Sequence, residues 1–441
     1  MKRFWFILLS LGLITAFSTS AMALDVKFSG EFYAAGMYLD KTNLKKDSGS
    51  DGISTAFYYQ RLRVRTDFVV SPGLTLITRF DAMERVWGGA RSSVPTVTTN
   101  DVDSAGTRAE NENIAFDWAY INYQSPIGIF DVGIMNDGAT GTIFGNSYAP
   151  AGRIKYSYTI GPVTLNAAYT KVKDQSYSAV TSSITTDADN DKYGIEGVYK
   201  WKDGLAGVQV NYYRYAEKKP PTTSYKIAYT LFTPYAIAKI GPVALQAELN
   251  YALGKYREYD SGIGDVKLEN LTGWIDATAA FGPIYFGGTF AYVSGDDPNT
   301  TDKSEGGTLN GGRDWNPCLL LFNYYDRTYW IGGLDGQGGS TNSGPMSNAY
   351  FFQGRVGVKP TTDLDIMASL SYSTADKKPT NFGSGVYGYE VDITGTYKIT
   401  NNLSYMLGVG YLFAGEYFKG TELNSQVRDD YMVINKLTLT F

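Results

Sequence analysis

The chain has 441 residues, a formal net charge of −5, one cysteine and no histidine. So mild a charge argues against a nucleic-acid partner. Without histidine the chain lacks Ser–His and Cys–His nucleophiles and His-ligated catalytic metals, so we expect a protein that is not an enzyme. Cys318 cannot form an internal disulfide, and we interpret it as a small buried apolar side chain.

The N-terminus has the features of an export signal. Two basic residues precede an apolar run over 4–17, and Ala21-Met22-Ala23 has the A-x-A form of a signal-peptidase site. The run is short for a transmembrane helix, although an uncleaved anchor remains the alternative. We therefore predict a cleaved signal peptide over 1–23 and a single mature domain over 24–441.

Much of the mature chain alternates apolar and polar residues. The stretches 243–253, 387–399 and 429–441 each place apolar residues on one face and polar residues on the other. Period two with one apolar face is typical of a strand that separates two different media. We predict an all-β fold, a transmembrane antiparallel up-and-down barrel with lipid outside and water inside. The stretch 112–124 is irregular, and its faces cannot be assigned.

Turn signals divide the mature chain at regular intervals. Three near-identical Gly-Pro turns, at 161–162, 241–242 and 282–283, exemplify the short connections. Longer polar segments alternate with the short turns, at 40–55, 88–111, 136–151, 173–190, 296–347 and 416–427. Counting between these marks predicts about eighteen strands, or sixteen if 128–135 or 266–270 does not cross the membrane.

Short motifs give a family resemblance. The chain resembles the Gram-negative porin superfamily in three places. These are the opening strand Val26–Phe32, the segment Ser125–Gly133 followed by Ile143-Phe144-Gly145, and the terminal Phe441. The resemblance implies a water-filled channel in the outer membrane, in contact with the lipid bilayer and lipopolysaccharide. It also implies a homo-oligomer, usually a trimer of 16-stranded barrels. A count of about eighteen is more similar to the substrate-selective porins.

Charged residues on the polar faces are candidates for the lumen wall. Arg61, Arg63 and Arg65 share one strand face and would form a ladder with roughly 6–7 Å between neighbours. The other predicted pore-lining basic residues are Arg79, Arg153 and Lys155. The predicted pore-lining acids are Glu196, Glu248, Asp276, Asp365, Glu390 and Asp392. Such charges either select ions or only stabilise the wall, and pairing with Asp67 and Asp81 would weaken the ladder's field.

Two loops are candidates for narrowing the pore. By the family resemblance, 136–151 with Phe144 corresponds to the inward-folding constriction loop of porins. The longest loop, 296–347, carries an apolar aromatic block that includes Trp315, Phe322 and Tyr324. An exposed loop would not normally carry such a block. We expect the loop to fold inward as a plug or gate; packing against a neighbouring subunit and a buried short helix are the alternatives.

No cofactor is expected, with one qualification. A structural Ca²⁺ could be held through the oxygen ligands of an acidic segment that contains Asp296, Asp297, Asn299, Asp302 and Glu305. The spacing of these residues does not match an EF-hand, and acidic loops are usually just solvated. The predicted function is a channel for passive diffusion of small hydrophilic solutes and ions. The alternative is a channel selective for anionic solutes through the arginine ladder.

Overall fold

The structure is a computed structural model that describes residues 25–46, 51–88, 114–139, 141–174, 188–217, 225–261, 264–307 and 312–441. The predicted signal peptide over 1–23 lies outside the described residues. Most of the predicted loops 88–111 and 173–190 also lies outside them.

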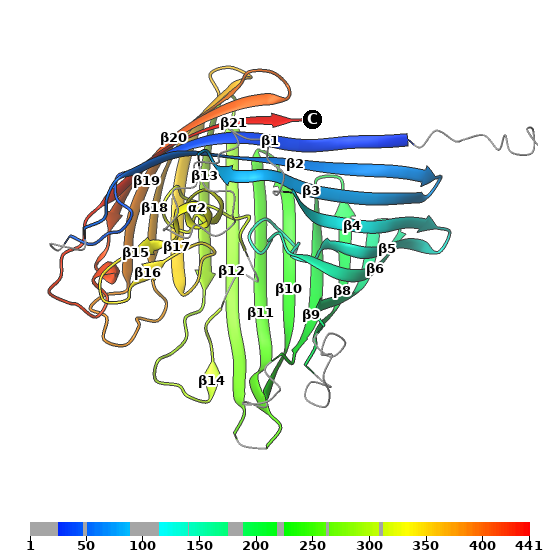
Figure 1. The fold of residues 1–441 in the computed structure, drawn as a ribbon, viewed down its shortest axis with the longest axis horizontal. Helices are drawn as coiled ribbons and strands as arrows, with labels where there is room; N and C mark the ends of the chain where they lie inside the picture. Colours follow the sequence, from blue (N-terminus) through cyan, green and yellow to red (C-terminus); the bar gives the residue numbers. More distant parts are fainter. Residues whose placement is uncertain are drawn as a thin grey trace, which may run out of the picture.

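Within the described residues, eighteen antiparallel strands close into a barrel (Figure 1). Each strand pairs with its neighbours in the chain, and β21 pairs with β1 to close the ring. The first nine are β1 (Asp25–Leu39), β2 (Thr55–Ser71), β3 (Leu74–Val86), β4 (Ile114–Ser125), β5 (Gly128–Asn136), β6 (Pro150–Ile160), β7 (Val163–Lys173), β8 (Asn190–Trp201) and β9 (Gly204–Tyr215). The others are β10 (Tyr225–Ile240), β11 (Val243–Tyr259), β12 (Val266–Phe281), β13 (Ile284–Val293), β17 (Ala349–Val358), β18 (Leu364–Thr374), β19 (Val386–Lys398), β20 (Leu403–Ala414) and β21 (Asp430–Thr440).

This result confirms the predicted fold class and the larger strand count. The two stretches whose membrane crossing was open, 128–135 and 266–270, lie in β5 and β12. Sixteen strands is therefore wrong. At the seam β1 pairs with β21 over Glu31–Leu39, and backbone atoms of Gly30 and Phe441 exchange hydrogen bonds of 2.8 and 3.1 Å. The first residues of β1 extend past the end of β21 and pair only with β2.

The period-two pattern separates an apolar outer surface from a polar interior. On β19, Tyr389, Val391 and Ile393 are 50 %, 38 % and 55 % exposed, whereas Glu390 and Asp392 between them point inward and are buried. An apolar exterior on every side is the reverse of a water-soluble protein and suits a surface surrounded by lipid.

A β-bulge explains the irregular stretch 112–124. Arg79 of β3 is opposite Trp118, but the next residue, Phe80, is opposite Phe116, so Asp117 is an extra residue in β4. An extra residue exchanges the two faces of a strand. Phe116 on one side of the bulge and Ile121 on the other therefore both face outward, although their positions differ in parity.

The connections at one end of the barrel are tight turns, and those at the other end are longer loops. Two of the longer ones fold back into the barrel: 137–149, between β5 and β6, and 294–348, between β13 and β17. The latter contains β14 (Lys303–Ser304), η1 (Tyr324–Thr328), α2 (Tyr329–Ile331), β15 (Leu334–Asp335) and β16 (Thr341–Asn342). Figure 1 shows α2 inside the ring of strands.

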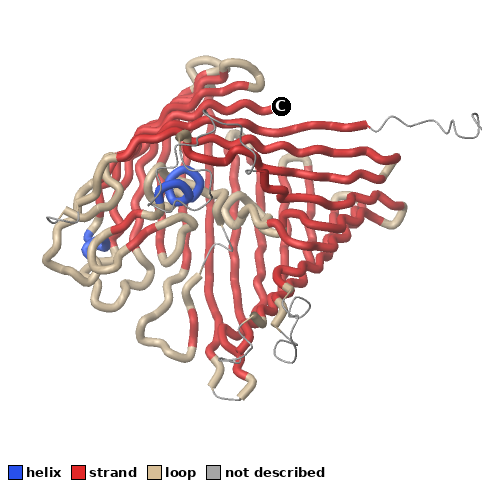
Figure 2. Tube along the Cα trace, in the orientation of Figure 1, coloured by secondary structure: helices blue, strands red, loops and turns tan. Residues whose placement is uncertain are grey.

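Helix is confined to short segments of the described chain (Figure 2). Another one, η2 (Glu416–Lys419), lies in the connection between β20 and β21. Among the described residues, no helix has the length and apolar character needed to cross a membrane.

Candidate functional site

Loop 137–149 crosses the interior to the opposite wall. Thr142 donates to Glu248 of β11 from its backbone nitrogen at 2.6 Å and from its hydroxyl at 2.8 Å. Phe144 is fully buried and stacks on Trp274 of β12, with ring centroids 5.4 Å apart. A Cβ at Gly141 would lie 2.7 Å from the Glu248 carboxylate, so only glycine allows the loop to come this close to the wall. The loop therefore divides the lumen.

Loop 294–348 packs against the wall on the other side. Both oxygens of Glu390 on β19 accept backbone N–H groups, from Leu320 at 2.6 Å and Leu321 at 2.7 Å. Asp326 accepts from Tyr59 of β2 at 2.8 Å and from Lys436 of β21 at 2.6 Å. The loop is therefore attached to strands on both sides of the barrel seam.

The four predicted plug residues lie inside the barrel. Phe144, Trp315 and Phe322 belong to one apolar cluster, in which Trp315 contacts Phe144 edge-on at 5.1 Å. Tyr324 lies apart from that cluster and lines a cavity beside the wall. The two loops are also joined directly, because the backbone nitrogen of Asp314 donates to the carbonyl of Asn146 at 3.1 Å.

Inward-facing apolar residues complete this cluster, and sequence reasoning did not identify them as a site. The residues are Ala35, Met37, Leu39, Leu412, Met432 and Ile434, all nearly or fully buried. They stand on the strand faces that are polar elsewhere in the barrel. Apolar residues on the lumen face of β1, β20 and β21 were the available signal for a seated loop, and it was overlooked.

The predicted arginine ladder faces inward on β2, but each member is paired. Arg63 forms two hydrogen bonds of 2.6 Å with Asp81. Arg65 lies 2.7 Å from Asp67, and Arg61 lies 3.3 Å from Glu31 and 3.6 Å from Glu84. The pairing that would weaken the ladder's field is thus present.

Arg79 lies beside the ladder on β3. Its guanidinium is 3.3 Å from Asp117, the bulged residue of β4, and it stacks over the rings of Trp118 and Tyr148 at 3.8 and 4.1 Å. A guanidinium held between a carboxylate and two aromatic faces is oriented rigidly.

Two cavities meet at this wall. One of about 180 Å³ lies between β1–β4 and loop 294–348, and its lining includes Arg61, Arg63, Arg313 and Tyr324. A second of about 250 Å³ is lined by Ser29, Gly30, Glu31, Arg63, Arg65, Arg79 and Trp118. Arg63 belongs to both linings.

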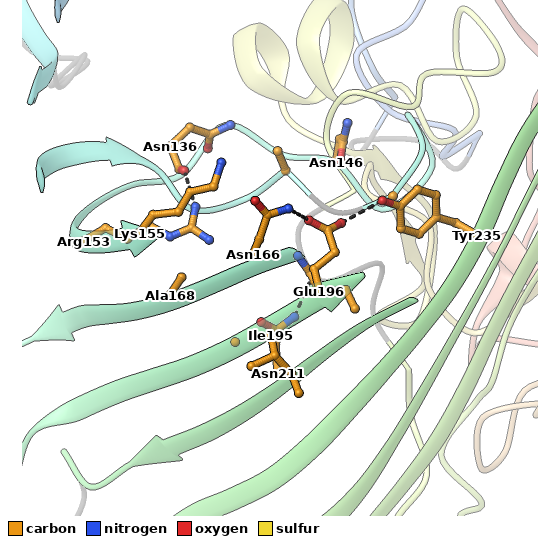
Figure 3. A pocket seen from close by; sticks show the side chains of 14 residues that line it. Asn136, Asn146, Arg153, Lys155, Asn166, Ala168, Ile195, Glu196, Asn211 and Tyr235 are labelled. Carbon is orange, nitrogen blue, oxygen red and sulfur yellow. Dashed lines mark hydrogen bonds between the residues drawn. The ribbon is translucent and has the colours of Figure 1, made fainter. Parts of the chain in front are cut away.

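The remaining predicted basic residues, Arg153 and Lys155 of β6, line a different cavity of about 330 Å³ on the other side of loop 137–149 (Figure 3). Arg153 is 3.4 Å from Asp137 and donates to the Asn136 carbonyl at 3.0 Å. Glu196 lines the same cavity, and Tyr235 and Asn166 each donate to its carboxylate at 2.7 Å.

The other predicted acids face inward with different surroundings. Glu248, Glu390 and Asp392 are covered by the two loops and are at most 3 % exposed, so these three do not border open lumen. Asp276 pairs with Arg355 at 2.7 Å. Asp365 lies 3.5 Å from Lys359 and remains partly exposed.

Burial changes the ionisation of loop side chains. Arg327 is 1 % exposed, and burial lowers the pKa of its guanidinium to about 10, although the charges of Asp430 and Glu390 oppose that effect. Burial raises the pKa of Tyr329 to about 12, and the neighbouring Glu84 adds to the shift. Near neutral pH, Arg327 is therefore a buried cation and Tyr329 a neutral hydroxyl.

The acidic segment proposed for Ca²⁺ uses its oxygens otherwise. Asp296 accepts from the backbone of Glu305, Asp297 accepts from Asn299, and Lys303 lies 3.0 Å from Glu305. Within the described residues, the one group of three potential ligands whose atoms lie within 4.8 Å of one another is Cys318, Glu390 and Asp392. The described geometry therefore gives the Ca²⁺ hypothesis no support.

The comparisons agree with this architecture. A family model described as Gram-negative porin matches residues 10–301. Pseudomonas aeruginosa OpdK aligns over 94 % of this chain and 99 % of its own, at 13 % identity and a TM-score of 0.52. Pseudomonas aeruginosa OpdQ aligns over 95 % and 97 %, at 13 % identity and a TM-score of 0.50. No curated protein matches the sequence.

At such identities the two structures support only the fold, whereas the family model covers about two thirds of the chain. The closed barrel, the apolar exterior and the polar cavities are consistent with that family. The chain belongs to the Gram-negative porins and is an outer-membrane channel for small solutes.

Proposed function

We propose that hydrophilic solutes diffuse passively along the β1–β4 wall, between that wall and the two infolded loops. The observation that carries this proposal is the pair of cavities of about 180 and 250 Å³, which share Arg63 in their linings. The wall at this junction is formed by charged and aromatic polar groups that bind water and solutes in passing.

The charges along this path favour weak ion selectivity. Arg61, Arg63, Arg65 and Arg79 each lie within 4 Å of a carboxylate. Alternating charges of both signs produce a strong local field but little net potential along the wall. The second candidate is a channel selective for anionic solutes. Arg313 favours it, because this arginine also lines the cavity of about 180 Å³ and has no carboxylate within 4 Å among the described residues.

We assign the two loops different roles. Loop 137–149 constricts the passage, because it spans the lumen and carries Tyr148 to within cation–π distance of Arg63 and Arg79. Loop 294–348 acts as a fixed plug over the β17–β21 side, because its apolar core is packed and its backbone is held by Glu390. A catalytic activity is not part of the proposal, and a homotrimer remains the expected assembly.

Planar-bilayer recording tests the path. In a salt gradient, the wild-type channel should give an ohmic current with a small reversal potential. Arg63→Ala should shift that potential towards cation preference, because Asp81 loses the guanidinium 2.6 Å away. Arg355→Ala is the matched control: Arg355 is paired with Asp276 at 2.7 Å but lines neither of the two cavities.

Two results would decide against this reading. An equal shift in both variants would place the passage elsewhere. A saturating current that anionic solutes block, and that recovers in Arg63→Ala, would instead establish the anion-selective alternative.

A further inference from the structure

The cavity of about 330 Å³ under loop 137–149 lies apart from the arginine-lined path (Figure 3). We propose that it is a second solute site, which binds small zwitterions of the amino-acid class between Lys155 and Glu196. The inference rests on the proposed function, since the ligand must first enter the lumen.

The floor of this cavity follows from strand register. Lys155, Ala168, Gly194 and Asn211 form one row across β6 to β9. Ala168 and Gly194 are small, so the row has a trough between a lysine at one end and an amide at the other. The Asn211 side chain already lies over Gly194, because a Cβ at Gly194 would lie 2.5 Å from the Asn211 side-chain oxygen. A larger residue at Gly194 would therefore push Asn211 into the cavity.

The neighbouring row supplies the acid. Asn166, Glu196 and Gln209 are adjacent across β7 to β9. Lys155 and Glu196 are two strand spacings and two residues along the strand apart, or roughly 12 Å between their backbones. The two side chains reach into the same space from those positions, as Figure 3 shows.

The charges of this cavity distinguish it from the ladder. Lys155 has no carboxylate within 4 Å among the described residues, and Glu196 has no cation within that distance among them. Neutral donors, Asn166 and Tyr235, hold the Glu196 carboxylate in place. Asp131 of β5 is the cross-strand neighbour of Lys155, but no ion pair within 4 Å joins the two side chains. Lys155 and Glu196 therefore give the cavity one charge of each sign that no ion pair among the described residues neutralises, which matches a ligand that carries both.

Buried amides add polar contacts suited to such a ligand. Asn211 is 1 % exposed and donates to the Gln209 side-chain oxygen at 2.8 Å, so the two amides form a fixed polar end of the cavity lining. A volume of about 330 Å³ is at the lower end of the range for small-molecule pockets. An amino acid fits this space, whereas a large oligosaccharide does not.

Current block in planar bilayers tests the proposal, with L-glutamine as the zwitterion, lactate as the anion and ethanolamine as the cation. Glutamine should block the wild-type channel at lower concentration than either singly charged solute. Lys155→Met and Glu196→Gln should each raise the half-blocking glutamine concentration about tenfold, the loss of one hydrogen bond to a charged group. Lys155→Met should also weaken lactate block, and Glu196→Gln should weaken ethanolamine block.

Further variants and outcomes keep the test decisive. Gly194→Val should abolish glutamine block while salt conductance persists, and Arg355→Ala should leave the half-blocking concentration unchanged. Unheated gel mobility confirms that each barrel has folded. Equal glutamine block in wild type, Lys155→Met and Glu196→Gln would overturn the site and leave the channel function intact. A folded barrel without any conductance in salt would overturn the proposed function itself.

Discussion

Cys318 offers a direct measure of how firmly loop 294–348 is seated. It is the one cysteine of the chain, it lies in the loop and it is 3 % exposed. Burial raises the pKa of its thiol, so the seated loop presents almost no thiolate to a reagent. Labelling therefore requires the loop to open, and its rate reports the fraction of open loop.

Leu321→Ala is the perturbation that we expect to release the loop. Leu321 is fully buried in the apolar cluster. Replacing such a leucine by alanine costs about 2–5 kcal/mol, from lost burial and from the cavity that remains. The strand pairs that close the barrel do not include this residue, so the loss falls on loop seating. At about 1.4 kcal/mol per factor of ten, the open fraction should rise about 30-fold or more.

The assay is the rate of maleimide labelling of the folded protein in detergent, read by mass. Leu370→Ala is the matched control, because it removes the same atoms from a lipid-facing residue that is 56 % exposed on β18. Wild type and Leu370→Ala should label slowly and at similar rates. If Leu321→Ala labelled as slowly as wild type, or if all three labelled rapidly, the loop would not be a seated plug.

Three other outcomes are expected. Glu390→Gln should speed Cys318 labelling by about 5- to 100-fold. The glutamine side chain has one oxygen in place of two, so it cannot accept the backbone N–H groups of both Leu320 and Leu321 in the same way, and one buried N–H is left unpaired. An unchanged labelling rate would contradict this anchoring. Phe144→Ala should raise single-channel conductance, since loop 137–149 loses its stacking on Trp274; a conductance equal to that of wild type would argue against constriction. A mass measurement on the unheated detergent complex should give three chains, and a monomer would refute the trimer.

The barrel could be predicted from sequence because one rule, apolar outside and polar inside, repeats in most strands. The rule failed at 112–124, where the extra residue Asp117 exchanges the faces and no turn residue marks the change. Bulges depend on how two strands pair, which the pattern of one strand does not encode.

The site was harder to predict than the fold, because its chemistry depends on partners distant in sequence. The inward direction of Arg63 follows from alternation, but its bidentate pairing depends on the register of β2 against β3. Glu390 has the pattern of a lumen charge, yet it is fully buried because a loop about 70 residues earlier in the chain covers it. Seating of that loop could have been suspected from Met432 and Ile434, apolar residues on a polar face.

The one-sided packing of loop 294–348 divides the inner wall into two regions under different selective pressures. Where β1 and β17–β21 support the loop, a change of size or polarity disturbs a packed apolar interface and should be rejected. On the side of β2–β9, many inward residues border cavities, and substitutions at those cavity-lining positions change which solutes pass. Tyr59 and Tyr213, which belong to apolar clusters, are exceptions on that side. New permeation properties can therefore evolve on one half of the circumference while the other half preserves the architecture.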